Sequence, residues 1–230
     1  MRTGSVSWRD ALGEARRRLA AAGVENAGQE ARWLAEAAAG CGPRDLASGL
    51  GEPVPSAVAG RMAASVERRA AGEPLQYVVG RWAFRRLELA LDPRVLIPRP
   101  ETEVLAGVAL DECDRLGARV VVDLGTGSGA LALALATERN ELEVWGTDLS
   151  ADALVVAEAN RAAVGAEIRL VQGSWYEALP AELAGRVDVI VSNPPYLSDA
   201  DMADLADEVR DWERAGALAA GPDGLEDVGV

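Results

Sequence analysis

The chain has 230 residues, enough for about one and a half to two ordinary domains, and 49% of them are apolar, so a sizeable core can form. The formal net charge is −14, and residues 76–230 hold 13 arginines against 28 acidic side chains. This distribution argues against nucleic-acid binding, because proteins that bind phosphate backbones normally present a basic face. The chain has no histidine, which excludes Ser-His-Asp and Cys-His catalysis and the usual zinc sites.

The two cysteines and the apolar segments predict where the chain resides. Cys41 and Cys113 lie far apart in no metal-type spacing, so we interpret them as small apolar side chains and expect no metal. The N-terminus is polar, and no apolar run reaches the ~18 residues of a membrane span. We therefore expect a cytoplasmic chain without membrane contact, in a reducing compartment.

Residues 1–73 are predicted to form a small helical domain. Ser7 and Asp10 have the spacing of a capping box and open a segment with apolar residues at helical intervals. A second helix is expected to follow Asn26, a short one to begin near Pro43, and a longer one to cover residues 56–71. Short helices joined by short loops form a bundle.

Residues 74–98 are predicted to be a linker between two domains. Leu75, Tyr77 and Val79 alternate with other residues, and a second alternating stretch covers residues 87–91. Such alternation, bounded by turn residues, predicts extended chain or a β-hairpin.

Residues 99–230 are predicted to form an α/β domain. After a helix over residues 101–116, four short apolar segments are strand candidates: residues 119–124, 142–147, 168–171 and 187–192. Helical segments, residues 130–137 and 151–163, follow the first and second of them. Strands that alternate with helices predict a parallel sheet with right-handed crossovers.

A glycine-rich turn follows the first of these strands. Gly125, Gly127 and Gly129 allow the backbone to approach a ligand closely, and Asp148 ends the second strand, where an acid accepts hydrogen bonds from ribose hydroxyls. The pattern also fits a dinucleotide fingerprint or a turn without a ligand. The third glycine, the acid at Asp123 and the acidic charge favour S-adenosylmethionine, which has no pyrophosphate.

The fourth strand ends in Asn193, Pro194, Pro195 and Tyr196. Ligands bind beyond the carboxyl ends of strands in open α/β sheets, so we expect Asn193 to face the same crevice as the glycine loop. The Asn193 side-chain carbonyl and the Pro194 carbonyl can accept the N–H groups of a planar amide or amine, and Tyr196 can stack on it. The alternative interpretation is a rigid Pro-Pro turn without a catalytic role.

With these motifs the sequence resembles the HemK-like family of release-factor glutamine N5-methyltransferases. Residues 72–80 with Phe84, residues 96–103, the two motifs above and residues 208–225 carry the resemblance, which extends over essentially the whole chain. It implies a Rossmann-like class I methyltransferase domain, residues 99–230, preceded by an N-terminal helical substrate-recognition domain, residues 1–73, and a β-hairpin linker, residues 74–98. It also implies transfer of a methyl group from S-adenosylmethionine to the glutamine of the Gly-Gly-Gln motif in class 1 peptide-chain release factors.

The resemblance also implies site residues. Asn193, Pro194, Pro195 and Tyr196 would hold the substrate glutamine and form the catalytic site, and residues 99–103 would border the donor pocket. The donor would contact Asp123, Gly125, Thr126, Gly127, Ser128, Gly129, Asp148, Ser174, Trp175 and Asn193. We expect a monomer with no direct nucleic-acid partner.

Three departures from the family pattern carry expectations. Ser174 stands where the family has Asp, which predicts weaker donor binding, and Arg214 stands where the family has Pro. The chain ends at Val230, so we expect a C-terminally incomplete sheet whose fourth strand is an exposed edge. The alternatives are an N6-adenine methyltransferase, a ribosomal-protein glutamine methyltransferase and an inactive or unstable truncated fragment.

Overall fold

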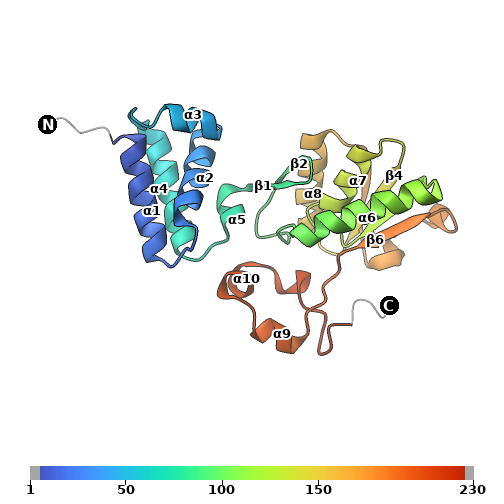
Figure 1. Ribbon diagram of the computed structural model, residues 1–230. Helices are drawn as coiled ribbons and strands as arrows, with labels where there is room; N and C mark the ends of the chain where they lie inside the picture. Colours follow the sequence, from blue (N-terminus) through green and yellow to red (C-terminus); the bar gives the residue numbers. More distant parts are fainter. Residues whose placement is uncertain (1–5, 226–230) are drawn as a thin grey trace. The chain divides into compact units, whose positions relative to one another are not determined.

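The computed structural model describes residues 6–225, in two compact units, Met1–Val79 and Gly80–Val230 (Figure 1). Along the chain, the elements follow the predicted order of a helical region, a hairpin and an α/β region. The domain boundaries given above remain predictions, and the expectation about the chain end at Val230 lies outside the described residues.

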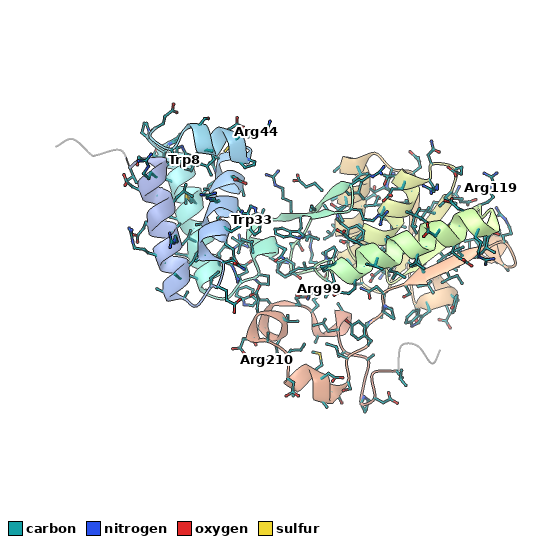
Figure 2. All side chains as sticks on the ribbon, in the orientation of Figure 1. Trp8, Trp33, Arg44, Arg99, Arg119 and Arg210 are labelled. Atoms are coloured by element: carbon teal, nitrogen blue, oxygen red, sulfur yellow. The ribbon has the colours of Figure 1, made fainter. Side chains whose placement is uncertain are left out.

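The first unit is a small helical bundle. Its helices are α1 (Trp8–Ala21), α2 (Ala27–Ala39), α3 (Pro43–Ser48), α4 (Ser56–Ala70) and α5 (Leu75–Val79). The Ser7 hydroxyl caps α1 by accepting from the Asp10 N–H at 3.2 Å. Trp8 packs inside the bundle (Figure 2), and the Arg69 guanidinium, buried on α4, pairs with Glu30 on α2 at 2.6 Å.

Helix α5 corrects the expectation of extended chain at Leu75, Tyr77 and Val79. The N–H groups of Tyr77 and Val78 donate to the Pro74 carbonyl at 3.0 and 3.1 Å, so the chain turns as a helix directly after the proline. Proline favours a helix start, since its missing N–H has no intrahelical acceptor there. Leu75, Tyr77 and Val78 are buried, so burial and not strand pairing produced the apolar pattern.

The second unit begins with the predicted hairpin, strands β1 (Arg81–Phe84) and β2 (Leu87–Ala90), which pair antiparallel. The Asn160 side chain, buried on α8 (Ala151–Val164), holds this hairpin in place. Its Oδ1 accepts from the Ala90 N–H at 2.7 Å, and its Nδ2 donates to the carbonyls of Ala90 and Ser128 at 3.1 and 2.9 Å. One amide therefore connects the hairpin, α8 and the glycine loop.

The four predicted strands form a parallel sheet in the order β5-β4-β3-β6, so this fold prediction is confirmed. The strands are β3 (Val120–Leu124), β4 (Glu143–Asp148), β5 (Ile168–Gln172) and β6 (Val189–Ser192), within one or two residues of the predicted ends. Within the described part of the chain, β6 forms one edge of the sheet, where Ile190 is exposed. The carboxyl ends of all four strands point to one end of the sheet.

Two apolar layers cover the sheet. Val121 contributes to the layer beneath α6 (Pro100–Leu116), α7 (Ala130–Glu138) and α8, while Val120 and Val122 face the other layer. That second layer contains Trp145 and Leu183 and is covered by the short 3₁₀ turns η1 (Trp175–Ala178) and η2 (Ala181–Leu183). Alternate side chains of a strand point to opposite faces, which explains this division.

After β6 the chain forms α9 (Asp199–Ala203), α10 (Asp207–Trp212) and the 3₁₀ turn η3 (Ala215–Ala217). No helix in residues 6–225 is long and apolar enough to span a membrane.

Candidate active site

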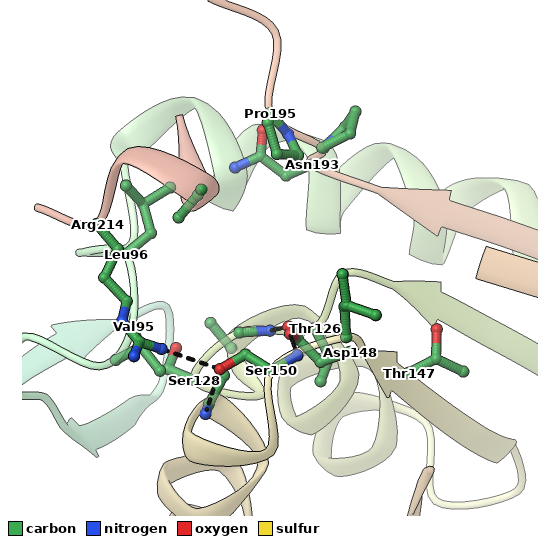
Figure 3. A pocket seen from close by; sticks show the side chains of 18 of the residues that line it. Val95, Leu96, Thr126, Ser128, Thr147, Asp148, Ser150, Asn193, Pro195 and Arg214 are labelled. Atoms are coloured by element: carbon green, nitrogen blue, oxygen red, sulfur yellow. Dashed lines mark hydrogen bonds between the residues drawn. The ribbon is translucent and has the colours of Figure 1, made fainter. Parts of the chain in front are cut away.

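A cavity of about 640 Å³ lies at the carboxyl ends of the parallel strands. Figure 3 shows Asn193 and Pro195 on one side of it, across from Thr126, Asp148 and Ser150. Ten of the residues predicted from the sequence line it: Gly125, Thr126, Gly127, Ser128, Asp148, Ser174, Trp175, Asn193, Pro194 and Pro195. The structure thus brings together segments nearly 70 residues apart in the sequence.

The glycine loop is fixed by backbone hydrogen bonds. The N–H groups of Gly125 and Thr126 both donate to the Thr147 carbonyl, at 2.9 and 2.8 Å, which joins the loop to the end of β4. Gly125 and Gly127 have φ of +73° and +56°, the left-handed region that glycine adopts without strain. The two glycines therefore expose backbone to the cavity, beside Thr126 and Ser128, which also line it.

Gly129 does not line the cavity. A Cβ at this position would lie 3.2 Å from Leu133 Cδ1 and 3.4 Å from Ala157 Cβ, so the glycine permits close packing of α7 against α8.

The Asp148 carboxylate joins the loop to the start of α8. Its Oδ2 accepts from the Gly127 N–H and its Oδ1 from the Ser150 N–H, each at 2.8 Å. A carboxylate has about four lone-pair sites, so two acceptor positions remain for ligand hydroxyls.

Asp123, predicted to contact the donor, is almost fully buried and does not line the cavity. Its Oδ2 accepts from the Thr126 hydroxyl at 2.6 Å and from the Ala132 N–H at 3.3 Å, while its Oδ1 has no hydrogen-bond partner within the described residues. Burial raises the pKa of Asp123 to about 7, opposed by the hydrogen bond from Thr126. In this structure Asp123 supports the loop from beneath.

Asn193 leaves the end of β6 and lines the cavity. Its Nδ2 donates to the Thr102 hydroxyl oxygen at 3.4 Å, the one hydrogen bond that the structure assigns to this side chain among the described residues. The Ser192 hydroxyl donates to the Leu124 carbonyl at 2.7 Å and so holds the end of β6 against the end of β3. The Asn193 side chain and the glycine loop therefore follow two neighbouring strands, β6 and β3, whose ends are bonded to each other.

Tyr196 lies outside the cavity lining, and 64% of it is exposed. Its N–H and that of Leu197 both donate to the Leu218 carbonyl, at 3.2 and 2.9 Å. The backbone after the Pro-Pro pair is therefore anchored while the Tyr196 ring faces solvent.

Ser174 and Trp175 line the cavity at the start of η1. The Ser174 side chain makes no capping hydrogen bond to this turn. Trp175 has φ of +43°, an uncommon conformation for a residue with a side chain, and packs against the apolar layer of Val120 and Trp145.

Of the segment expected to border the pocket, residues 99–103, Thr102 lines it and the other four residues do not. Sequence reasoning missed further lining residues. The remaining lining residues are Arg94, Val95, Leu96, Pro98, Ala130, Leu131, Thr147, Leu149, Ser150, Ala153, Gly173, Arg214, Ala215, Gly216 and Ala217.

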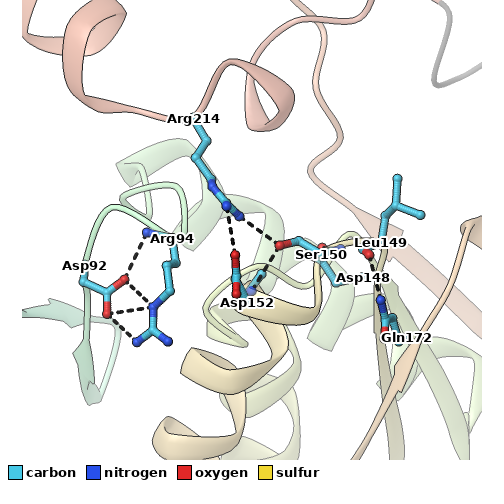
Figure 4. A network of polar contacts seen from close by, with 9 residues as sticks. Asp92, Arg94, Asp148, Leu149, Ser150, Asp152, Gln172 and Arg214 are labelled. Carbon is cyan, nitrogen blue, oxygen red and sulfur yellow. Dashed lines mark hydrogen bonds and ion pairs between the residues drawn. The ribbon is translucent and has the colours of Figure 1, made fainter.

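Residues 214–217 gave no sequence signal for a ligand site, because they are brought to the cavity only by tertiary contacts. Arg214 donates to the Ser150 hydroxyl and to Asp152 Oδ2, both at 3.0 Å (Figure 4). These two hydrogen bonds hold residues 214–217 against the start of α8 at the rim of the cavity.

A metal site is not indicated by the side chains. In residues 6–225 no group of three or more cysteine or acidic side chains is arranged to hold a metal ion.

Comparisons with known proteins show which family the sequence resembles. Residues 10–80 match the family described as PrmC N-terminal domain, and residues 102–209 match the methyltransferase small domain. The release factor glutamine methyltransferase of Moorella thermoacetica is 42% identical over 96% of this chain and 77% of the relative. Proteins of the same description from Bordetella pertussis and Deinococcus radiodurans are 46% and 43% identical, over 85% and 95% of this chain and 72% and 77% of the relatives.

These relatives share both the helical unit and the α/β unit with this chain, and the α/β unit has the Rossmann-like fold of class I methyltransferases. The resemblance inferred from the motifs is therefore confirmed. The chain belongs to the release factor glutamine methyltransferase family.

Proposed function

We propose that this chain transfers a methyl group from S-adenosylmethionine to the side-chain amide nitrogen of a glutamine, in the Gly-Gly-Gln motif of class 1 peptide-chain release factors. The observation that carries the proposal is the shared cavity, in which the glycine loop and Asp148 lie opposite Asn193 and Pro195 (Figure 3). Membership of the family supports the choice of substrate.

The cavity suits a nucleoside-type donor. Its volume of about 640 Å³ falls within the usual range for small-molecule sites. The positive φ angles of Gly125 and Gly127 let the backbone approach a ligand, and Asp148 retains acceptor positions for ribose hydroxyls. We assign the adenine ring of the donor to the vicinity of Ser174 and Trp175. There the Ser174 hydroxyl replaces the aspartate carboxylate expected for the family. The donor, when bound, supplies an electrophilic methyl carbon on a sulfonium sulfur.

Asn193 and Pro194 would hold the acceptor. An amide nitrogen is a weak nucleophile because its lone pair is delocalised, so its orientation toward the methyl carbon must be fixed. The Asn193 Oδ1 and the Pro194 carbonyl each accept one N–H of the glutamine NH2, and both become stronger partners as positive charge develops on the nitrogen. The new N–C bond forms as the C–S bond breaks, and one N–H proton then leaves to water. This step needs no dedicated base, consistent with a chain without histidine.

We further assign roles to three parts that do not line the cavity. Asp123 and Gly129 shape the donor loop, and the exposed Tyr196 contacts the incoming polypeptide.

The three regions of the chain have separate roles. The helical region, residues 1–73, recognises the release factor. Residues 74–98 link it to the catalytic region, and residues 99–230 carry out the transfer. We place the protein in the cytoplasm, where translation takes place, and expect it to act as a monomer.

The proposal is tested by incubating a class 1 release factor with S-adenosylmethionine and the chain, followed by mass spectrometry of the peptide that contains Gly-Gly-Gln. One added methyl on the glutamine is expected. A release factor whose motif glutamine is changed to asparagine is the matched control and should gain none. Methylation of a synthetic oligonucleotide or a ribosomal protein in place of the release factor would overturn the assignment.

A further inference from the structure

Thr102 contacts the Asn193 side chain, although it lies outside the motif of residues 193–196. It lies in the first turn of α6 and is 7% exposed, and its Oγ1 accepts from Asn193 Nδ2 at 3.4 Å. The two residues are 91 positions apart in the sequence, and both line the cavity. The contact therefore links the start of a helix to the end of the edge strand β6 at the reacting end of the cavity.

The orientation of the Asn193 amide decides whether the site can hold a glutamine. An asparagine side chain has an acceptor oxygen and a donor nitrogen of nearly the same size, related by a 180° rotation. With the oxygen toward the cavity, Asn193 accepts an N–H of the substrate amide. With the nitrogen toward the cavity, two NH2 groups face each other and no hydrogen bond forms.

We propose that Thr102 is a positioning residue: its hydroxyl holds the Asn193 side-chain amide in the orientation seen here, with Nδ2 toward Thr102 and Oδ1 left for the nitrogen of the substrate glutamine. This inference rests on the proposed function for its consequence in catalysis. The orientation of the amide itself is a property of the protein and can be measured without a substrate.

The surroundings of Thr102 make it a rigid support. Its backbone N–H donates to the Arg99 carbonyl at 3.0 Å, and Pro100 begins the helix. The Arg99 guanidinium pairs with Glu213 at 2.5 Å, and the Glu213 side chain is only 1% exposed. Because the Glu213 end of this pair is buried, breaking the pair would leave a buried charge without a partner, which resists displacement.

The other side of the same helical turn is also fixed. The Glu103 carboxylate accepts from the Arg85 N–H at 3.0 Å, and the Arg85 guanidinium donates to the Glu103 carbonyl at 2.9 Å. Since the first turn of α6 is fixed from two directions, Thr102 stays in place while the Asn193 amide orients against it.

The test compares Thr102→Val, which removes the hydroxyl at nearly constant shape, with Thr102→Ser, which keeps it. Thr137→Val is the matched control, since in the described residues the Thr137 hydroxyl donates only to carbonyls of its own helix, at 2.7 and 3.2 Å. For each full-length variant, kcat, the KM for the release factor and the Kd for the donor are measured. We expect Thr102→Val to lower kcat about 10- to 100-fold with the donor Kd within about twofold, while Thr102→Ser stays within about threefold of the parent.

The second measurement is the ¹⁵N NMR signal of the Asn193 side-chain NH2 in the ligand-free protein. The proton that Asn193 Nδ2 donates to Thr102 is expected to exchange slowly with water in the parent and in Thr102→Ser. In Thr102→Val it is expected to exchange fast. An unchanged signal in Thr102→Val, or equal losses in kcat and donor affinity, would overturn the positioning role. If the parent protein fails to methylate the release factor while the NMR difference is present, the proposed function is wrong and the positioning of Asn193 stands.

Discussion

The two sides of the cavity are built in different ways. On the donor side, the N–H groups of Gly125, Thr126 and Gly127 are all bonded to the end of β4, at Thr147 and Asp148. On the acceptor side, the Asn193 side chain has one hydrogen bond of 3.4 Å among the described residues, and Tyr196 faces solvent. A small donor benefits from a preformed site, whereas a glutamine on a protein loop needs an accessible one. The difference predicts that substitutions on the two sides separate binding from turnover.

The largest effect is expected for Asn193→Ala. Removing one of two carbonyl acceptors at a nitrogen that gains positive charge should lower kcat about 100- to 1,000-fold. Although the resemblance also implies a donor contact for Asn193, the donor Kd should change less than about threefold, because the donor side keeps its backbone hydrogen bonds. Calorimetry with the donor alone and turnover on the release factor measure the two quantities. A variant that keeps its turnover would contradict the acceptor role of Asn193.

Asp148→Ala should have the opposite pattern. The substitution removes the acceptors for ribose hydroxyls and for the N–H groups of Gly127 and Ser150, so the donor Kd should rise about 10- to 100-fold. Turnover at saturating donor should fall much less. Glu158→Ala on α8 is the control, since this exposed carboxylate pairs only with Arg161 in the described structure. Unchanged donor affinity in Asp148→Ala would remove the proposed ribose site.

The raised pKa of Asp123 leads us to expect that the stability of the fold depends on pH. Its pKa is raised from 3.8 to about 7 in the folded protein, chiefly by burial, so the folded state holds a proton that the unfolded state has lost between these values. The free energy of unfolding should therefore fall as pH rises through this window, by on the order of 1–2 kcal/mol between about pH 5 and about pH 7.

The variant Asp123→Asn cannot ionise at this position and should lose that part of the slope. Urea unfolding at several pH values measures it, with Asp199→Asn on exposed α9 as the control. Parallel pH profiles for the parent and Asp123→Asn would show that Asp123 is ionised throughout.

The smallest effect is expected at the cavity rim. Arg214 and Asp152 form an exposed pair, whose side chains are 43% and 58% accessible, so Arg214→Ala should raise the donor Kd only about two- to fivefold. The effect should shrink at high salt. The double variant Arg214→Asp with Asp152→Arg should recover part of the loss. A loss as large as that of Asp148→Ala would mean that the rim, and not the glycine loop, dominates donor binding.

The sequence by itself determined the parallel sheet, the loop after β3 and the position of Asn193 after β6. These features follow from local rules, because apolar segments of strand length, glycines at strand ends and helical periodicity are all encoded within a few residues. It did not determine α5, where an alternating apolar pattern resulted from burial in a helical turn.

Only the tertiary structure decided which side chains face the cavity. Asp123 and Gly129 belong to the predicted loop yet do not line the cavity: Asp123 is buried and bonded to Thr126 and Ala132, and Gly129 permits the close packing of α7 against α8. Thr102 and Arg214 reach the cavity from segments far from the glycine loop in the sequence. Their positions depend on contacts between residues 62 to 114 positions apart, such as Arg99 with Glu213 and Arg214 with Asp152. Local sequence patterns extend over a few residues, so they cannot encode such long-range contacts, which form only when the whole α/β unit folds.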